Sequence, residues 1–366
     1  MSKLYDLINK LCSDGVEYVD LKNVCYITKG VQFNKKNMNE TGSFPVINGG
    51  INPSGYIEQY NQEKETITIS QGGASAGYVN FINSKFWAGA HCYIIKPEEC
   101  VLNRYLYHFL KSKEHQLQEC QYGAGIPALA KSTVANLKIP FPPLEVQREI
   151  VRVLDNFTEL TQELTQELTL RKKQYSYYRD YLLDFGDDVE YKALNEITTL
   201  SRGVRVVRNQ LETTGTIPVY QNSLTPLGYY TKNNCKANTT FIIGAGNAGE
   251  IGFSYVDFWS ADDCYYFICS EKILDRFLYY ALLCKYDFIK LQVRKASIPR
   301  ISRNVIEKIK IPVPPIEEQE RIVKILDKFD TLCNDLTTGI PAEIALRKKQ
   351  YEYYRDKLLS FEELRK

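Results

Sequence analysis

Two long stretches of the chain place apolar residues three, four and seven positions apart, which is the spacing of one helix face. The first runs from residue 144 to residue 185 without a glycine or a proline. A Pro-Pro step stands before it and Gly186 after it, and these residues suit a first helical turn and a C-terminal stop. The pattern predicts one helix of about 43 residues, roughly 65 Å long at 1.5 Å per residue.

The second stretch, residues 316 to 364, carries the same apolar stripe, but it contains Gly339 and Pro341. These two residues predict a break or a kink in its middle. A helix of this length needs a partner to cover its apolar face. We therefore expect the two stretches to pack antiparallel as a coiled coil. The leucines that we expect in its seam are Leu160, Leu164, Leu168 and Leu332.

The segments between these helices carry a different pattern. Short alternating runs at 66–69, 240–243 and 265–268 are punctuated by Gly, Asn and Pro, which indicates strands and turns. Short helices rich in Leu and Tyr are expected at 103–113 and 275–285, each after a strand. Each segment is therefore predicted to be a mixed α+β domain.

The sequence also contains an internal repeat, whose two copies are offset by 172 residues. IPFPPLEVQREIVRVL at 139–154 matches IPVPPIEEQERIVKIL at 311–326. Solenoid arrays use periods of only some 20 to 50 residues, so a repeat this long is a duplicated domain. A pseudo-twofold protein of this kind suits a ligand with two parts. The predicted segments are an N-terminal helix at 1–17, a first domain at 18–142, a central helical region at 143–190, a second domain at 191–314 and a C-terminal helical region at 315–366.

A weaker echo lies at the N-terminus, where DGVEY at 14–18 resembles DDVEY at 187–191. A leucine-rich amphipathic stretch precedes both, so the repeat unit begins inside a helix. We expect the N-terminal helix, from Lys3 to Leu11, to dock where the C-terminal helix ends and to close the molecule into a ring.

Charge separates the two kinds of segment. The whole chain has a formal net charge of +2. Residues 18–142 hold 12 basic and 9 acidic side chains and residues 191–310 hold 16 and 10, so these blocks carry +3 and +6 while the helical regions are acidic. Basic blocks joined by acidic helices fit a protein that touches a polyanion with its two domains.

The N-terminal residues and the cysteines indicate the cellular compartment in which the protein resides. MSKLYDLINKL is amphipathic and charged, which predicts neither a signal peptide nor a membrane anchor and favours a cytoplasmic protein. The ten cysteines include no CxxC pair, and the chain has only three histidines. We therefore expect reduced thiols that act as small apolar residues, and no metal site.

One motif resembles a cofactor site. Gly244 to Gly249 read GAGNAG, a full GxGxxG after an apolar run, which on paper is a dinucleotide fingerprint. The fingerprint needs a helix next, so that pyrophosphate can sit on its N-terminus, whereas IGFSYVDFW has the composition of a strand. A turn is the better explanation, and a free-standing nucleotide-cofactor enzyme remains the alternative.

Other catalytic patterns also fail. The chain has no Walker A motif, and its Pro-Pro steps lack the Asn or Asp of an amino-methyltransferase motif. His91, His108 and His115 have neither ligand spacing nor a nucleophile partner. We therefore expect no active site and no bound cofactor.

Side chains that suit DNA recur at matching places in both domains. Arg is the common reader of guanine and Asn or Gln of adenine, while Lys and Arg also contact phosphates. The second domain is rich in arginine and the first in amides and hydroxyls, so their chemistry differs. The candidates in the first domain, the last two around the Ile126-Pro127 turn, are Lys29, Gln32, Asn34, Lys35, Lys36, Gln71, Ser75, Tyr122 and Lys131. Those in the second domain, the last four around the Ile298-Pro299 turn, are Arg202, Arg205, Arg208, Asn222, Asn247, Arg294, Lys295, Arg300 and Arg303.

IPVPPIEEQERIVKILDKF at 311–329 and LRKKQYEYYRDKLLSF at 346–361, with their counterparts at 139–157 and 170–185, resemble the specificity subunit of type I restriction-modification systems. The resemblance covers essentially the whole chain. It implies two target recognition domains that each read one half of a bipartite double-stranded DNA site, held apart by the helices. It also implies that the helices bind methyltransferase subunits, with two expected, and restriction subunits in the full complex, and that the chain is not itself catalytic.

The first helix contains a tandem four-residue unit, TQEL at 161–164 and again at 165–168, and the second helix is four residues longer. The resemblance implies that this unit sets the length of the unread spacer between the half-sites. Each copy adds about 6 Å of helix and roughly 40° of rotation. A low-complexity stretch with no role in spacing is the alternative. The target bases themselves do not follow from the sequence.

Overall fold

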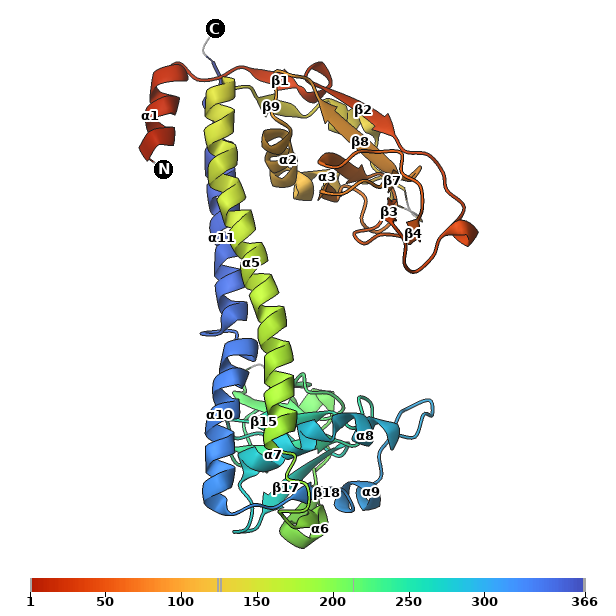
Figure 1. The fold of residues 1–366 in the computed structure, drawn as a ribbon, viewed down its shortest axis with the longest axis vertical. Coiled ribbons are helices and arrows are strands. Elements are labelled where there is room, and N and C mark those ends of the chain that lie inside the picture. Colours follow the sequence, from red (N-terminus) through yellow and green to blue (C-terminus); the bar gives the residue numbers. More distant parts are fainter. Residues whose placement is uncertain (1, 124, 126, 213, 365–366) are drawn as a thin grey trace. The chain divides into compact units, whose positions relative to one another are not determined.

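The computed structural model describes residues 2–123, 125, 127–212 and 214–364, and Figure 1 labels its elements. The chain divides into two compact units, Met1–Thr165 with Glu343–Lys366 and Gln166–Ala342. Each unit holds one copy of the repeat together with part of the long helices. No helix in the described ranges is long and apolar enough to cross a membrane.

The strands of the first unit make three small sheets. They are β1 (Tyr18–Asp20), β2 (Cys25–Lys29), β3 (Phe44–Ile47), β4 (Tyr56–Ile57), β5 (Thr66–Ser70), β6 (Val79–Ile82), β7 (Trp87–Ala88), β8 (Cys92–Pro97) and β9 (Lys138–Pro140). Their orders are β2-β8-β5-β6, β4-β3-β7 and β1-β9. Pairing is antiparallel except between β3 and β7.

The helices of the first unit include the N-terminal helix and parts of both long stretches. They are α1 (Ser2–Leu11), α2 (Asn103–Ser112), α3 (Glu114–Glu119), α4 (Lys131–Ala135), the first part of α5 (Leu144–Leu182), and all but the first residues of α11 (Ile340–Leu358), with 3₁₀ turns η1 (Leu21–Asn23) and η2 (Lys35–Asn37). The helices predicted at 103–113 and at 3–11 are thereby confirmed.

The second unit repeats this arrangement. Its strands are β10 (Tyr191–Ala193), β11 (Thr198–Arg202), β12 (Ile217–Tyr220), β13 (Gly228–Tyr230), β14 (Thr239–Ile243), β15 (Ile251–Ser254), β16 (Trp259–Ser260), β17 (Cys264–Cys269) and β18 (Lys310–Pro312). Its helices are the rest of α5, α6 (Leu194–Ile197), α7 (Asp275–Cys284), α8 (Tyr286–Leu291), α9 (Arg303–Glu307) and α10 (Ile316–Asn334), with the 3₁₀ turn η3 (Arg208–Gln210). The sheet orders β11-β17-β14-β15, β13-β12-β16 and β10-β18 match those of the first unit strand for strand, so the duplication read from the sequence is a duplication of fold.

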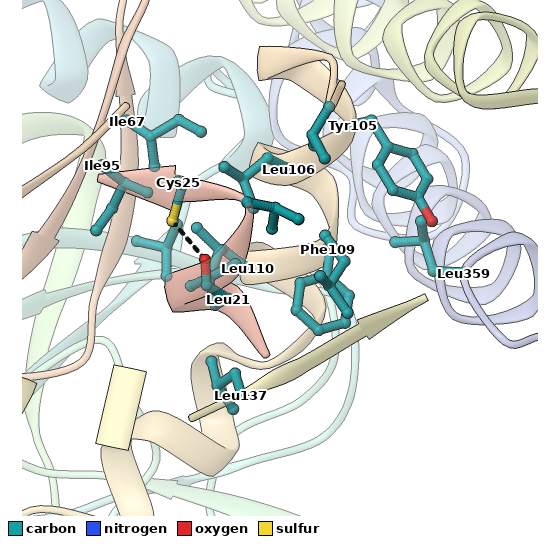
Figure 2. Packing of buried hydrophobic residues seen from close by; sticks show 14 of the residues in the cluster. Leu21, Cys25, Ile67, Ile95, Tyr105, Leu106, Phe109, Leu110, Leu137 and Leu359 are labelled. Carbon is teal, nitrogen blue, oxygen red and sulfur yellow. Dashed lines mark hydrogen bonds between the residues drawn. The ribbon is translucent and has the colours of Figure 1, made fainter. Parts of the chain in front are cut away.

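The core of the first unit lies between its four-stranded sheet and α2. Ile67 and Ile95 of the sheet and Leu106 and Phe109 of α2 are buried in one cluster (Figure 2). The buried positions of α2 follow the spacing of one helix face. Leu359, just beyond α11, belongs to the same cluster. The C-terminal stretch is therefore part of this core.

The predicted long helix is confirmed as α5, which is 39 residues long. In the first unit Phe157 stacks on Tyr354 of α11 with ring centroids 5.4 Å apart, and in the second Tyr178 stacks on Phe329 of α10 at 5.5 Å. Within each unit the partner helix runs antiparallel to α5 (Figure 1). The four leucines expected in the seam are half-buried, namely Leu160, Leu164, Leu168 and Leu332.

The break in the second stretch is also confirmed, but it starts before the glycine. Helix α10 ends at Asn334, and the carboxylate of Asp335 accepts hydrogen bonds from the hydroxyl and the backbone N–H of Thr337, both at 2.6 Å. These bonds lower the pKa of Asp335 to about 2. Pro341 then stands in the first turn of α11, where its missing N–H costs nothing.

The N-terminal segment lies against the end of the C-terminal helix. The Nζ of Lys3 is 3.4 Å from the carboxylate of Glu149 on α5. The Val16 N–H donates to the carbonyl of Glu362 at 2.9 Å, and the Tyr18 hydroxyl donates to that of Phe361 at 2.9 Å. The segment is thereby fixed to the residues that follow α11.

A buried glutamine joins each domain to its helix. Gln147 Oε1 accepts from the Leu102 N–H at 2.9 Å, and its Nε2 donates to the Pro142 carbonyl at 2.9 Å and to that of Cys100 at 3.3 Å. Gln319 makes the same three bonds in the second unit, with the Leu274 N–H and the carbonyls of Lys272 and Pro314. Both glutamines are fully buried. They fix the start of the long helix to the segment that precedes α2 or α7.

An aspartate about two turns further along α5 joins α2 to α5 in the first unit. Asp155 is paired with Arg104 and lies 2.8 Å from Nε2 of the buried His108. Burial lowers the pKa of His108, so the ring is neutral: Nε2–H donates to Asp155 and Nδ1 accepts from the Tyr351 hydroxyl at 2.9 Å. His108 of the first unit therefore connects α2, α5 and α11.

The second unit builds this junction with tyrosine instead. Arg276 pairs with Asp327 and Asp330, both at 2.7 Å. The Tyr280 hydroxyl, in the place of His108, donates to Asp327 at 2.5 Å. The hydroxyl of Tyr175, the counterpart of Tyr351, is buried and has no hydrogen-bond partner among the described residues. The two junctions are thus alike in plan and different in chemistry.

Candidate nucleic-acid interface

Loops from distant parts of each domain meet at one place. In the second unit they are 202–208, 220–224, 244–249, 261–263 and 294–300, and we call this set rim 2. In the first unit they are 29–36, 47–49, 71–77, 88–91 and 122–129, and we call this set rim 1, of which Ala124 and Ile126 lie outside the described residues. The loops are held together by backbone hydrogen bonds, so the framework does not depend on which side chains the loops carry.

In rim 2 the glycine-rich loop at 244–249, which we call the glycine loop, is hydrogen-bonded to the other loops. The Gly246 N–H donates to the Pro299 carbonyl at 3.0 Å, and the Asn247 N–H donates to the Asn222 carbonyl at 2.9 Å. The hairpin beyond α8 closes through paired bonds between Arg294 and Arg300 at 2.8 and 3.2 Å. Two N–H groups of the GxGxxG segment thus donate to backbone carbonyls, and strand β15 follows the segment, as predicted, where the fingerprint needs a helix.

Rim 1 repeats the bond between the glycine-rich loop and the Ile-Pro turn and the paired bonds of the hairpin. The Gly73 N–H donates to the Pro127 carbonyl at 2.8 Å, and the Leu129 N–H donates to the Gln71 carbonyl at 2.7 Å. Tyr122 and Ala128 exchange two bonds, both at 2.9 Å, which is the counterpart of the hairpin in rim 2. The two rims therefore share a backbone framework.

Close packing of the loops explains one glycine in each rim. A Cβ on Gly203 would meet the carbonyl oxygens of Ser260 and Ala261 closer than the 3.0 Å that real Cβ atoms tolerate. Gly30 meets the carbonyls of Ala88 and Gly89 in the same way. The loop after the first long strand of each domain can approach the turn before β8 or β17 only because it has no side chain there.

The structure gathers most of the predicted residues of the second domain on rim 2. The exposed ones are Arg202, Arg205, Arg208, Asn222, Asn247, Arg294, Lys295 and Arg300. Arg303 is separate, because it begins α9 and pairs with Glu307 of the same helix at 2.7 Å. Rim 2 is therefore a dense arginine surface on a rigid backbone, which suits phosphates and guanine edges.

Rim 1 gathers a smaller and less basic set. Lys29 ends β2, and Gln32, Lys35 and Lys36 follow it as exposed residues. Asn34 caps η2 by accepting from the Lys36 N–H at 3.0 Å, so its oxygen is already engaged. Gln71, Ser75 and Tyr122 lie in the loops of rim 1, whereas Lys131 begins α4 outside them, as Arg303 does in the second unit.

Two cysteines, Cys92 and Cys264, lie just behind the rims at the start of β8 and of β17. All ten thiols are free, and six are buried. Burial raises the pKa of Cys92 and of Cys264 to about 12, so both stay protonated at neutral pH. The described residues also contain no group of His, Cys, Asp and Glu side chains arranged to hold a metal ion.

The helices carry a second surface that the sequence analysis missed. Leu170, Tyr177 and Tyr181 on α5 expose 65, 65 and 66 % of their surface, and Tyr177 stacks on Tyr181 with centroids 6.2 Å apart. We call these residues stripe 2. Their counterparts Leu346 and Tyr353 on α11, which we call stripe 1, expose 53 and 60 %. The signal was present in the leucine that opens LRKKQY and in the tyrosine two positions after that block, which recur in both copies and are exposed.

Comparison with known proteins decides the family. The family model described as the type I restriction modification DNA specificity domain matches twice, at residues 13–170 and 186–346. This chain belongs to the specificity-subunit family of type I restriction-modification systems. The family implies recognition of DNA sequence, and the two matches coincide with the two copies of the repeat.

Relatives and solved structures agree with this placement. The specificity subunit of a type I restriction enzyme of Escherichia coli is 33 % identical over 395 residues, covering 95 % of each chain. The MpnII specificity subunit of Mycoplasma pneumoniae is 30 % identical over 306 residues, covering 64 % of this chain and 92 % of its own. The crystal structure of the type I S subunit from M. genitalium has the same fold, with a TM-score of 0.69, 21 % identity and coverage of 94 and 96 %. The predicted fold class is thereby confirmed for this specificity subunit.

Proposed function

We propose that this chain is the non-catalytic, DNA-reading subunit of a type I restriction-modification complex, and that rim 1 and rim 2 each contact one half of a bipartite double-stranded target. The observation that carries the proposal is that the rims share their backbone hydrogen bonds and differ in their side chains. A common backbone framework that carries different base-contacting side chains suits two half-sites of different sequence.

The two stripes support docking of two methyltransferase subunits on the helices. An exposed apolar residue that is kept at the same position in both copies is not explained by packing of the core. Two equivalent stripes suit two copies of one partner, since equal surfaces bind equal partners. Restriction subunits would join the assembled methyltransferase.

The tandem TQEL unit supports a ruler for the spacer. The hydroxyls of Thr161 and Thr165 donate to the carbonyls of Phe157 and Thr161, four residues back, at 2.8 and 2.7 Å. These bonds stay within α5, so adding or removing one unit adds or removes only that unit's own bond. We also propose that the contacts of the N-terminal segment with Phe361 and Glu362 close the chain into a ring.

The test of the DNA-reading function is expression with a type I methyltransferase subunit in a host that lacks DNA methylation. Mapping of methylated adenines should give a motif with two specified halves and an unread spacer. The isolated chain should bind duplex DNA with an affinity that falls steeply as salt rises. A motif with a single half, or tight binding of a nicotinamide cofactor or S-adenosylmethionine by the isolated chain, would contradict the proposal.

The docking surface is tested separately. The double variant Leu170→Ser, Tyr177→Ser should lose one of two methyltransferase subunits in a size measurement while DNA binding by the chain alone is kept. Leu336→Ser is the matched control, because Leu336 is 79 % exposed and lies outside both stripes. Equal loss of the subunit in the control would refute this placement of the docking site.

A further inference from the structure

The turn before β17 is the point where the loops of rim 2 converge. The Ala261 N–H donates to the Tyr220 carbonyl at 2.9 Å, and the Asp263 carbonyl accepts from the Gly244 N–H at 2.7 Å. These two bonds tie the turn to the loop after β12 and to the glycine loop. The residue between them, Asp262, is thus held by backbone bonds on both sides.

The carboxylate of Asp262 stands among arginines but is not paired with one. Arg202 Nε donates to the backbone carbonyl of Asp262 at 2.8 Å rather than to its side chain. One carboxylate oxygen, Oδ1, accepts from the Gln221 amide at 3.4 Å. Within the described ranges no cation lies within ion-pair distance of this carboxylate, so the group remains available to a ligand.

A carboxylate is unfavourable on a surface that meets only phosphates, because like charges repel. It is favourable where it faces the edge of a base. In the major groove the exocyclic N4 amino group of cytosine is the donor that Asp and Glu accept from. An acid on an arginine-rich rim therefore weakens binding to DNA in general and strengthens binding to one base.

The first unit cannot make this contact. Its equivalent turn, before β8, carries Ala90 and His91 where rim 2 has Asp262 and Asp263. The backbone is the same, because the His91 carbonyl accepts from the Gln71 N–H at 2.8 Å as that of Asp263 does from Gly244. The turn is thus a position where the framework is kept and the chemistry differs.

We propose that Asp262 is a specificity-determining residue that accepts a hydrogen bond from the N4 amino group of a cytosine in the half-site bound by rim 2. The inference rests on the proposed DNA-reading function. Gln221 orients the carboxylate through Oδ1 and leaves Oδ2 to the base.

The experiment replaces Asp262 by Ala and by Asn in the complex with the methyltransferase. Binding is measured on duplexes that carry each of the four bases at each position of the half-site. At one position the preference for cytosine should fall roughly ten- to hundred-fold with Ala, and with Asn the preference should move toward adenine. Other positions and the other half-site should keep their preferences. Arg205→Ala is the control, since loss of an exposed arginine should weaken all duplexes alike and reduce the salt dependence.

The outcomes separate the two claims. If Asp262→Ala changes affinity for all duplexes by the same factor, or leaves every preference intact, the inference is wrong while DNA reading stands. Lost discrimination at a base other than cytosine also overturns it. Failure of the unaltered complex to select any duplex would refute the proposed function itself.

Discussion

Tyr351 and Tyr175 occupy the same place in the repeated LRKKQY block, yet only one of them has a hydrogen-bond partner. The Tyr351 hydroxyl donates to His108 Nδ1 at 2.9 Å, whereas that of Tyr175 is buried without a partner in the described chain. We predict that Tyr175→Phe stabilises the second unit and that Tyr351→Phe destabilises the first. The same chemical change should thus have opposite signs in the two copies.

The magnitudes follow from burial. The Tyr175 side chain is 8 % exposed, and a buried polar group without a partner costs about 1–3 kcal/mol. Phe keeps the ring that stacks on Phe329, so Tyr175→Phe should raise the unfolding free energy by about 1 kcal/mol. Tyr351→Phe leaves His108 Nδ1 buried and unsatisfied and should cost about 1–3 kcal/mol. In a unit of this size 1 kcal/mol moves the melting midpoint by about 2–4 °C.

The two tryptophans allow each unit to be followed alone. Trp87 lies in the first unit and Trp259 in the second. Their Nε1–H groups donate to the backbone carbonyls of Val31 and Val204 at 2.9 and 2.8 Å. Thermal unfolding is therefore monitored by fluorescence in a Trp87→Phe background for the second unit and in a Trp259→Phe background for the first. If Tyr175→Phe lowers the midpoint of the second unit as Tyr351→Phe lowers that of the first, the reasoning is refuted.

Three further results are expected. Burial lowers the pKa of His108 from 6.5, so at acidic pH the unfolded chain takes up a proton that the folded chain does not, and the first unit should lose stability as pH falls below 6.5. His108→Tyr should remove this pH dependence in thermal melts, and an unchanged dependence of the melting midpoint on pH would contradict the prediction. Gly203→Ala should reduce DNA binding and lower the melting midpoint of the second unit, because its Cβ meets the carbonyl of Ala261. Gly50→Ala, which lies outside both rims and meets Asn52 only at an ordinary contact distance, should leave DNA binding and both melting midpoints unchanged. Deletion of Thr165 to Leu168 should shorten the spacer of the methylated motif and leave both half-sites unchanged; an unchanged spacer on methylome sequencing would rule out the ruler.

The periodic parts of this fold were predictable because their pattern is local. The stripe that defines α5, the alternation of β5 and β14 and the strand after Gly249 all follow from neighbouring residues. The start of the break at Asp335 was missed, because an aspartate stops a helix only when nearby N–H groups turn toward it. Val146, which stands where the second copy has Glu318, is buried in the cluster that contains Leu4 of α1, and this contact joins segments far apart in the sequence.

The candidate site was predictable in its arginines and not in its acids. Arg202, Arg205 and Arg208 recur every third residue and stand out in a sequence. Asp262 reaches rim 2 through sheet topology, since the turn before β17 meets the loop after β12 only when the strands are assembled. The role of His108 also needs three helices that lie far apart in the sequence.

The glutamine joints have a consequence for how such chains diversify. Every side-chain hydrogen bond of Gln147 and Gln319 ends on a backbone atom, and one of the three residues that supply those atoms differs between the copies, Cys100 in the first and Lys272 in the second. Because these bonds end only on backbone atoms, the joint does not depend on the side chains of the residues that the glutamines contact. The start of each long helix therefore recognises the backbone path of the domain in front of it, and the side chains of that domain can change while the joint is kept.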